Sequence, residues 1–174
     1  MNTLQEAVEE ITYARSEFPE EALAEFQDKE IFPTIVELAS QPEEVLDILI
    51  GDIITEGLPD ILYCTFNGDF ELLKNCVLDE YISEYVRNGM LRVLAQLYSD
   101  GRMDEEEWKQ FIRVCVRNEA ENEMAEGIVA GELADAICRC HFVDMLPEIR
   151  FMSEHEMLVA AYMGDYEEFL DEMF

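Results

Sequence analysis

The chain has 174 residues, and its 41 Asp and Glu against 11 Lys and Arg give a formal net charge of −30. A charge of that sign repels nucleic acid and anionic membranes, so we expect neither as a partner. No segment approaches the roughly 18–20 consecutive apolar residues of a membrane span, and the first residues lack the basic and apolar regions of a secretory signal.

Apolar residues at helical spacing predict an all-α chain, beginning with two helices near the N-terminus. Thr3 can cap a helix that runs to about Arg15, and Pro19 can stand in the first turn of a second helix. Four more helices follow in this half of the chain, and their expected ranges are 31–39, 43–56, 59–66 and 70–78.

In the second half of the chain, the spacing of apolar residues and the positions of cap residues predict five further helices. One covers 83–99 and ends at Gly101, because glycine readily takes the left-handed conformation of a helix cap. The next begins with the acidic run 104–107 and carries Trp108 on its core face. The remaining ranges are 122–139, 142–152 and a capping helix over 163–170. Gly127 and Gly131 in the first of these are spaced for a close helix approach, and we expect a break or kink at Pro147 in the second.

Apolar positions recur after 41 and then 43 residues. The shift of 41 pairs Val45 with Val86, Phe32 with Leu73, Val36 with Val77, Leu49 with Met90 and Ile53 with Leu94; the shift of 43 pairs Val86 with Val129, Met90 with Leu133 and Leu94 with Ile137. HEAT-type repeats run about 40–47 residues. We therefore predict one domain over 1–174, a short α-solenoid of HEAT-like antiparallel helix pairs in a right-handed stack.

The phrase Asp79…Tyr85-Val86-Arg87…Met90…Leu94 resembles the HEAT-like pattern, in which an acidic turn precedes a Val-Arg pair. We expect Asp79 to cap the second helix of the pair or to bind Arg87. Arginine suits that second role, since its planar fork can bind a carboxylate through two hydrogen bonds.

Four segments of the chain together resemble an uncharacterised bacterial domain family. These segments are 31–36 leading to Pro42, 51–62, 84–87 and 146–150. Members of that family look HEAT-like, and many carry a SEC-C zinc motif after the helical part. The resemblance covers about Pro19 to Arg150. This chain departs from the pattern by having no Cys-rich SEC-C segment before Phe174 and by being shorter between Phe18 and Ile31. The resemblance implies the fold, and it transfers no activity.

Carboxylates offer one candidate site, at Asp52, Glu56 and Asp60. Asp52 and Glu56 lie one helical turn apart, which costs about 0.2–0.5 kcal/mol through repulsion unless a cation neutralises them. Arg87 or Arg92 of the next repeat could do so, or a metal ion could. The two interpretations are an ion pair between repeats and a metal-assisted enzyme, and we prefer the ion pair.

Basic residues offer a second candidate, because Lys109, Arg113 and Arg117 follow one another at four-residue spacing. Of the 11 basic residues, 7 lie between Lys74 and Arg117. Such a row either neutralises neighbouring acidic helices or forms a concave site for an anion or carboxylate, and internal neutralisation is the commoner case.

Cysteine and histidine offer a third candidate, Cys138-Arg139-Cys140-His141, with ligand types that suit zinc. A Cys-x-Cys pair on a helix, however, points its two sulfurs about 200° apart. The only other histidine, His155, lies between two glutamates, and the chain has no phosphate loop, dinucleotide fingerprint or nucleophile elbow. We assign no metal, no cofactor and no catalytic residue.

The favoured hypothesis is a non-enzymatic module that binds a protein or peptide, since stacked helix pairs form concave surfaces. The polar residues expected to serve it or to support the fold are Asp52, Glu56, Asp79, Arg87, Lys109, Arg113 and Arg117. The alternatives are the metal-assisted enzyme and an acidic mimic of nucleic acid, which Lys109, Arg113 and Arg117 argue against. Five cysteines, an odd number placed mainly in apolar patterns, favour a reducing cytoplasm. Apolar residues near the C-terminus, such as Phe169, Met173 and Phe174, could cap the array or pair two chains.

Overall fold

The computed structural model describes residues 29–43, 45–46, 57–159 and 169. Within these ranges every element is helical and no strand occurs, so the predicted all-α class is confirmed. The helices expected from Thr3, from Pro19 and over 163–170 lie outside the described residues, as does most of the one expected over 43–56. The chain divides into two compact units, Met1–Leu94 and Ala95–Phe174.

The first unit contains α3 (Phe32–Ala39), α6 (Leu58–Thr65), α7 (Phe70–Leu78) and the beginning of α8 (Glu84–Ser99). Proline stands in the first turn of α3 and of α6, where its missing N–H breaks no helical hydrogen bond. Asp69 caps α7, because its carboxylate accepts the backbone N–H of Leu72 at 3.0 Å. The predicted bounds of these helices agree with the observed ones to within a residue or two.

The core of the first unit is built around Phe66, which is 1% exposed. Its ring meets Phe32 and Phe70 edge to face, with centroids 5.3 Å and 4.9 Å apart, a favourable arrangement of aromatic pairs. A Cβ on Gly89 of α8 would lie 3.4 Å from the Cγ of Pro59, so α8 packs closely on the start of α6.

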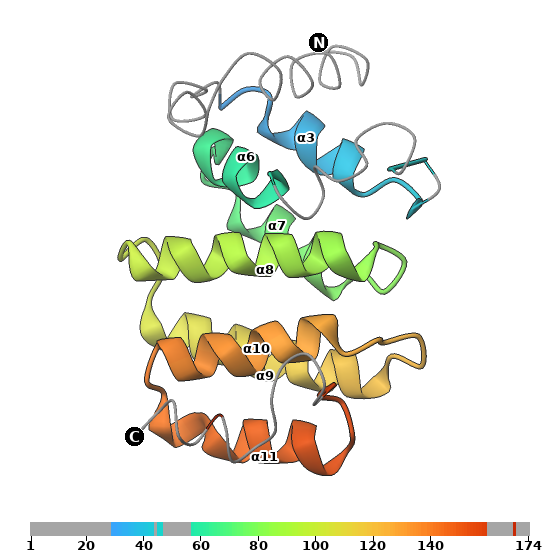
Figure 1. Ribbon diagram of the computed structural model, residues 1–174. Coiled ribbons are helices and arrows are strands. Elements are labelled where there is room, and N and C mark those ends of the chain that lie inside the picture. The colour runs from blue at the N-terminus through green and yellow to red at the C-terminus, as the bar shows by residue number, and fades with distance from the viewer. Residues whose placement is uncertain (1–28, 44, 47–56, 160–168, 170–174) are drawn as a thin grey trace. The chain divides into compact units, whose positions relative to one another are not determined.

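The second unit contains α9 (Glu105–Glu121), α10 (Ile128–Arg139), the short 3-10 helix η1 (Val143–Met145) and α11 (Leu146–Glu154). Helix α10 packs against both α9 and α11 (Figure 1). Trp108 is fully buried, with its ring stacked on Tyr98 and Phe111 at centroid distances of 6.2 Å and 6.1 Å.

One predicted element of the second unit needs correction. The helix expected over 122–139 begins only at Ile128, because Asn122 ends α9 and Gly127 takes a left-handed conformation, with φ of +87°. Of the break or kink expected at Pro147, the structure has the break. The 3-10 helix η1 ends at Met145 and α11 begins at Leu146, with Pro147 in its first turn, where proline is tolerated.

The ends of α8, α10 and α11 share one hydrogen-bonding pattern. A left-handed residue follows each helix, at Gly101, His141 and Glu156, with φ of +70°, +52° and +56°. The next N–H then bonds back to a carbonyl five residues earlier, for example Arg102 to Leu97 at 3.0 Å. The expected termination at Gly101 is therefore confirmed.

Among the pairs of the 41- and 43-residue shifts with both members described, every residue except Val45 is buried. Ten of them are at most 2% exposed: Phe32, Val36, Leu73, Val77, Val86, Met90, Leu94, Val129, Leu133 and Ile137. Val45 is an exception, since it is 38% exposed while Leu46 beside it is fully buried. No helix in the described part of the chain is long and apolar enough to cross a membrane.

Gly127 packs against the segment that follows α11. A Cβ on it would lie 2.7 Å from the carbonyl oxygen of Met157 and 2.9 Å from Cγ2 of Val159. The sequence predicted that another helix would pack closely on Gly127 and Gly131. At Gly127 the segment after α11 makes this close contact instead of a helix. Gly131 is buried within α10.

We expect Gly127→Ala to lower the free energy of unfolding by at least about 2 kcal/mol. A left-handed backbone costs a non-glycine residue roughly 1–2 kcal/mol, and overpacking typically costs about 1–3 kcal/mol more. Urea unfolding of both proteins measures the difference. Gly101→Ala is the matched control, because its φ is +70° but no atom lies within 4 Å of the added Cβ. Equal losses in the two variants would contradict the packing of Met157 and Val159 on Gly127.

Candidate functional site

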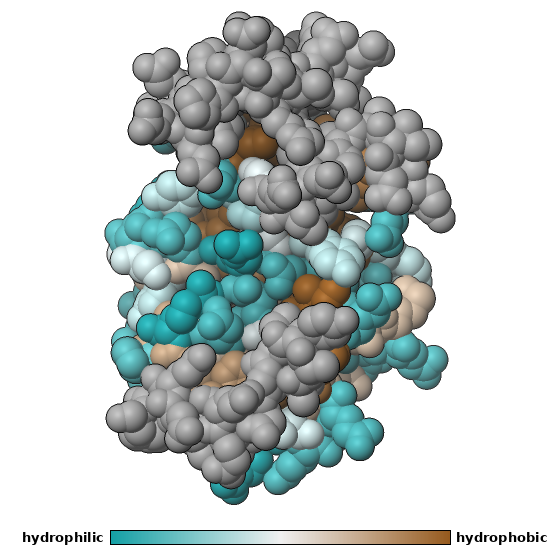
Figure 2. Space-filling model, in the orientation of Figure 1, coloured by the Kyte–Doolittle hydropathy of each residue, from teal (hydrophilic) through white to brown (hydrophobic). Residues whose placement is uncertain are grey.

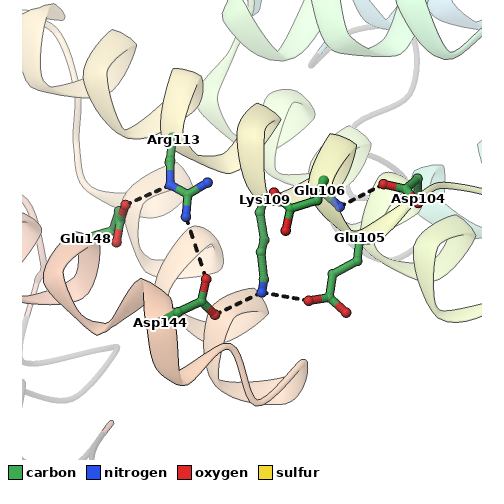
Figure 3. Close-up of polar contacts among 7 residues, drawn as sticks. All are labelled: Asp104, Glu105, Glu106, Lys109, Arg113, Asp144 and Glu148. Carbon is green, nitrogen blue, oxygen red and sulfur yellow. Dashed lines mark hydrogen bonds and ion pairs between the residues drawn. The ribbon is translucent and has the colours of Figure 1, made fainter.

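The row of basic residues on α9 faces the start of α11. Nζ of Lys109 lies 2.6 Å from Oε1 of Glu105 and 2.8 Å from Oδ1 of Asp144 (Figure 3). It also lies 4.5 Å from the ring centroid of Phe142. Nε of Arg113 donates to Oε1 of Glu148 at 3.0 Å. Two cations four residues apart on α9 therefore meet two carboxylates four residues apart on η1 and α11.

Lys109 and Asp144 both remain ionised around neutral pH. The hydrogen bonds that Lys109 donates to Asp144 and to Glu105 raise the pKa of Lys109, and the first of these bonds lowers the pKa of Asp144. Lys109 thus stays protonated and Asp144 stays deprotonated, as a structural ion pair requires.

This geometry agrees with internal neutralisation rather than with an open anion site. Lys109 and Arg113 already bind carboxylates of the same chain, and Nη2 of Arg113 also lies 3.8 Å from Oδ2 of Asp144. Arg117, one turn further along α9, is exposed and has no ion pair with any described residue.

Asp79 and Arg87 bind different groups, which corrects the expected contact between them. Nε of Arg87 donates to the carbonyl oxygen of Val77 at 2.8 Å, and Arg87 is only 1% exposed. The carboxylate of Asp79 accepts the backbone N–H of Tyr81 at 3.0 Å in the turn after α7, so it does not cap α8. A local turn thus engages the aspartate, while the arginine stabilises an end carbonyl of α7.

The carboxylate candidate is only partly described. Asp52 and Glu56 lie outside the described residues. Asp60 is exposed in the first turn of α6. Burial, followed by the charge of Asp60, raises the pKa of the nearby Cys64 thiol.

The three residues of the Cys138-x-Cys140-His141 candidate have separate surroundings. Sγ of Cys138 is buried and donates to the carbonyl oxygen of Phe169 at 3.6 Å. Cys140 is partly exposed, and burial raises the pKa of its thiol. His141 is exposed and takes a left-handed conformation after α10. Among the described residues, no group of three or more His, Cys, Asp or Glu could hold a metal ion.

A pocket that the sequence analysis missed lies in the second unit, with a volume of about 300 Å³. It is formed by the end of α9, the connection to α10, the start of α10 and the residues after α11. The lining residues are Glu119, Ala120, Asn122, Ala125, Glu126, Gly127, Ala130, His155, Glu156, Met157 and Val159. The sequence did carry one local signal for it, since Asn122 is a turn former, and its side chain accepts the N–H of Met124 at 2.9 Å.

The pocket wall is mainly polar, and its acidic groups are Glu119, Glu126 and Glu156. Glu119 is 3% exposed, whereas Glu126 and Glu156 are exposed. The C-terminal ends of α9 and α11, which carry a partial negative charge, and the N-terminal start of α10 all contribute lining residues. The described lining includes no Lys or Arg. On the face shown in Figure 2, the described surface is mainly hydrophilic, with smaller apolar patches.

Comparison with curated proteins and with solved structures finds no significant match. One family model, described as a protein of unknown function (DUF1186), matches residues 1–173. This match confirms the resemblance to an uncharacterised family that the sequence segments indicated. Because the model matches nearly the whole chain, the protein belongs to the DUF1186 family of proteins of unknown function.

Proposed function

We propose that this protein is a non-enzymatic binding module, a HEAT-like α-solenoid that binds a basic segment of a protein or peptide through the pocket of its second unit. The observation that carries the proposal is the combination, in one pocket, of three glutamates with a few apolar residues and no described Lys or Arg. The recurrence of buried positions after 41 and 43 residues supports the repeat architecture.

The chemistry of the pocket suits one lysine or arginine side chain. Ala120, Ala130 and Val159 can pack on the apolar stem of such a side chain. Its charged end can bind the glutamates and the C-terminal carbonyls of the helices. The volume of about 300 Å³ lies at the lower end of the range for ligand pockets, so it suits a single side chain.

The charge balance of the chain supports the same partner. Two arginines of the second unit are bound by carboxylates of the chain itself. Arg113 binds Glu148 at 3.0 Å, and Arg139 binds Glu132 at 2.6 Å and Asp135 at 2.8 Å. With a net charge of −30, a large acidic excess remains to attract a basic segment and to speed its association. The cysteines favour a cytoplasmic setting for this encounter, since none of the five forms a disulfide.

Titration with a fluorescent lysine- and arginine-rich peptide tests the proposal, at an ionic strength of about 0.15 M so that long-range attraction is screened. We expect saturable binding that weakens about tenfold, or about 1.4 kcal/mol, in the double variant Glu126→Lys with Glu156→Lys. Both positions are exposed, so the change should leave the fold intact. Fluorescence anisotropy gives the two dissociation constants.

The matched control is the double variant Glu43→Lys with Glu80→Lys. It alters the net charge by the same amount at exposed residues outside the pocket. Nearly parental affinity in this control supports the pocket. An equal loss of affinity in both double variants would show that binding follows net charge alone, and the pocket would then be rejected as the binding site.

A further inference from the structure

His155 lines the pocket of the second unit and is fixed against the last turn of α11. Its backbone N–H and its ring nitrogen Nδ1 both contact the carbonyl oxygen of Phe151, at 3.1 Å and 2.8 Å. The imidazole also lies over the ring of Phe151, with centroids 4.0 Å apart and an angle of 32° between the ring planes. These contacts hold the imidazole in one place at the edge of the pocket.

The contact with Phe151 determines which ring nitrogen of His155 carries a hydrogen. A backbone carbonyl oxygen only accepts hydrogen bonds, so Nδ1 donates in this contact and must carry the hydrogen. In the neutral imidazole the other nitrogen, Nε2, then has no hydrogen and is an acceptor. Neutral His155 therefore contributes an uncharged acceptor to the lining of the pocket.

Protonation of His155 reverses this property. The imidazolium carries a hydrogen on both nitrogens, so Nε2 becomes a donor and the ring gains a positive charge. Nδ1 can donate to Phe151 in either state, so the added charge stays at the pocket. A positive charge there repels a basic side chain in the same pocket and competes with it for the glutamates.

The other charged groups of the described lining are carboxylates. Glu119 comes from the end of α9, Glu126 from the connection to α10, and Glu156 follows His155 directly. Glu154, the last residue of α11, is exposed on the other side of His155. The described residues at the start of α10 contribute no titratable side chain. Among these residue types, histidine is the one whose charge ordinarily changes between about pH 5 and 8.

We propose that His155 makes the pocket sensitive to pH, so that a basic segment binds tightly when His155 is neutral and more weakly when it is protonated. This inference rests on the proposed function, because it concerns the same pocket and the same partner. Affinity falls as the pH falls, since the positive charge on His155 appears on acidification. The other histidine of the chain, His141, follows α10 and is not part of the described lining.

Fluorescence anisotropy with an arginine-rich peptide with blocked ends tests the inference, because arginine keeps its charge at every pH used. We expect the dissociation constant of the parent protein to rise about fivefold between about pH 7.5 and 5.5, the factor for two like unit charges about 4 Å apart in water. His155→Asn stays neutral and has an amide nitrogen near the position of Nδ1. Its dissociation constant should therefore be the same at both pH values.

The matched control is His141→Asn, which removes the other histidine. Asparagine tolerates the left-handed conformation that His141 adopts, so this variant should keep the fold and the rise seen in the parent protein. Loss of the rise in His141→Asn would overturn the inference, because it would place the pH dependence outside the pocket.

The remaining outcomes separate this inference from the proposed function. No saturable binding of the peptide at the higher pH would overturn both. Equal affinity of the parent protein at the two pH values would overturn the inference alone. A rise that persists in His155→Asn would also overturn it, and would assign the titration to a carboxylate such as Glu119, since burial can shift the titration of a carboxylate.

The imidazole nitrogen shifts of the free protein, measured by nuclear magnetic resonance, give a second test that needs no peptide. At the higher pH they should show the hydrogen of His155 on Nδ1, as the contact with Phe151 requires. A hydrogen on Nε2 instead would overturn the inference, because neutral His155 would then present a donor rather than an acceptor.

Discussion

The Arg87→Ala variant should have a free energy of unfolding about 3–5 kcal/mol lower than that of the parent protein. Arg87 is 1% exposed, and its Nε holds the carbonyl oxygen of Val77 at 2.8 Å. Removal leaves a buried acceptor without this donor, which costs roughly 1–3 kcal/mol. It also opens a cavity, and deleting a large buried side chain costs roughly 2–5 kcal/mol. Guanidinium unfolding followed by circular dichroism measures the loss.

Arg92→Ala is the control, because it removes an exposed arginine from the same helix and changes the net charge equally. Surface changes of this kind usually stay within about 0.5 kcal/mol. The double change Asp79→Ala with Arg87→Ala should be additive within about 0.3–0.5 kcal/mol, since the two side chains bind different groups. Similar stability in Arg87→Ala and Arg92→Ala would contradict the buried contact with Val77.

Trp108→Ala should also cost about 3–5 kcal/mol, the usual loss for a large buried aromatic residue. The ring is fully buried between Tyr98 and Phe111, so nothing else can fill its volume without rearrangement of α9. The loss should be seen in thermal unfolding as a lower midpoint.

The neighbouring change Gln110→Ala provides the comparison, because Gln110 is exposed on the same helix. It should alter stability by no more than about 0.5 kcal/mol. A Trp108→Ala protein that unfolds like Gln110→Ala would show that the aromatic cluster does not form the core of the second unit.

The parts of the fold that the sequence predicted are those governed by local chemistry. Helix α7 was expected over 70–78 from the helical spacing of its apolar residues, and the end of α8 was expected at Gly101 because glycine readily takes the left-handed conformation. The start of α10 was misplaced because 122–127 is rich in glutamate and alanine, which favour helix in isolation. The contact of Gly127 with Met157 and Val159 overrides that preference, and it joins residues 30 or more positions apart.

The candidate site shows the same limit of sequence reasoning. The spacing of Lys109 and Arg113 predicted that they share a helix face and neutralise acidic neighbours. Their partners Asp144 and Glu148 lie 35 residues further on, and no local pattern identifies them. The pocket was missed because the ends of three helices form it, and only the fold brings them together.

The most direct test of the proposed function is to map a bound basic peptide on the protein by nuclear magnetic resonance. Net charge alone attracts such a peptide diffusely, so the location of binding decides the question. Backbone amide shifts during titration should concentrate at Asn122, Glu126, Gly127, Ala130 and Glu156, and they should saturate together. Shifts spread evenly over the acidic surface, or concentrated away from these residues, would contradict binding at the pocket.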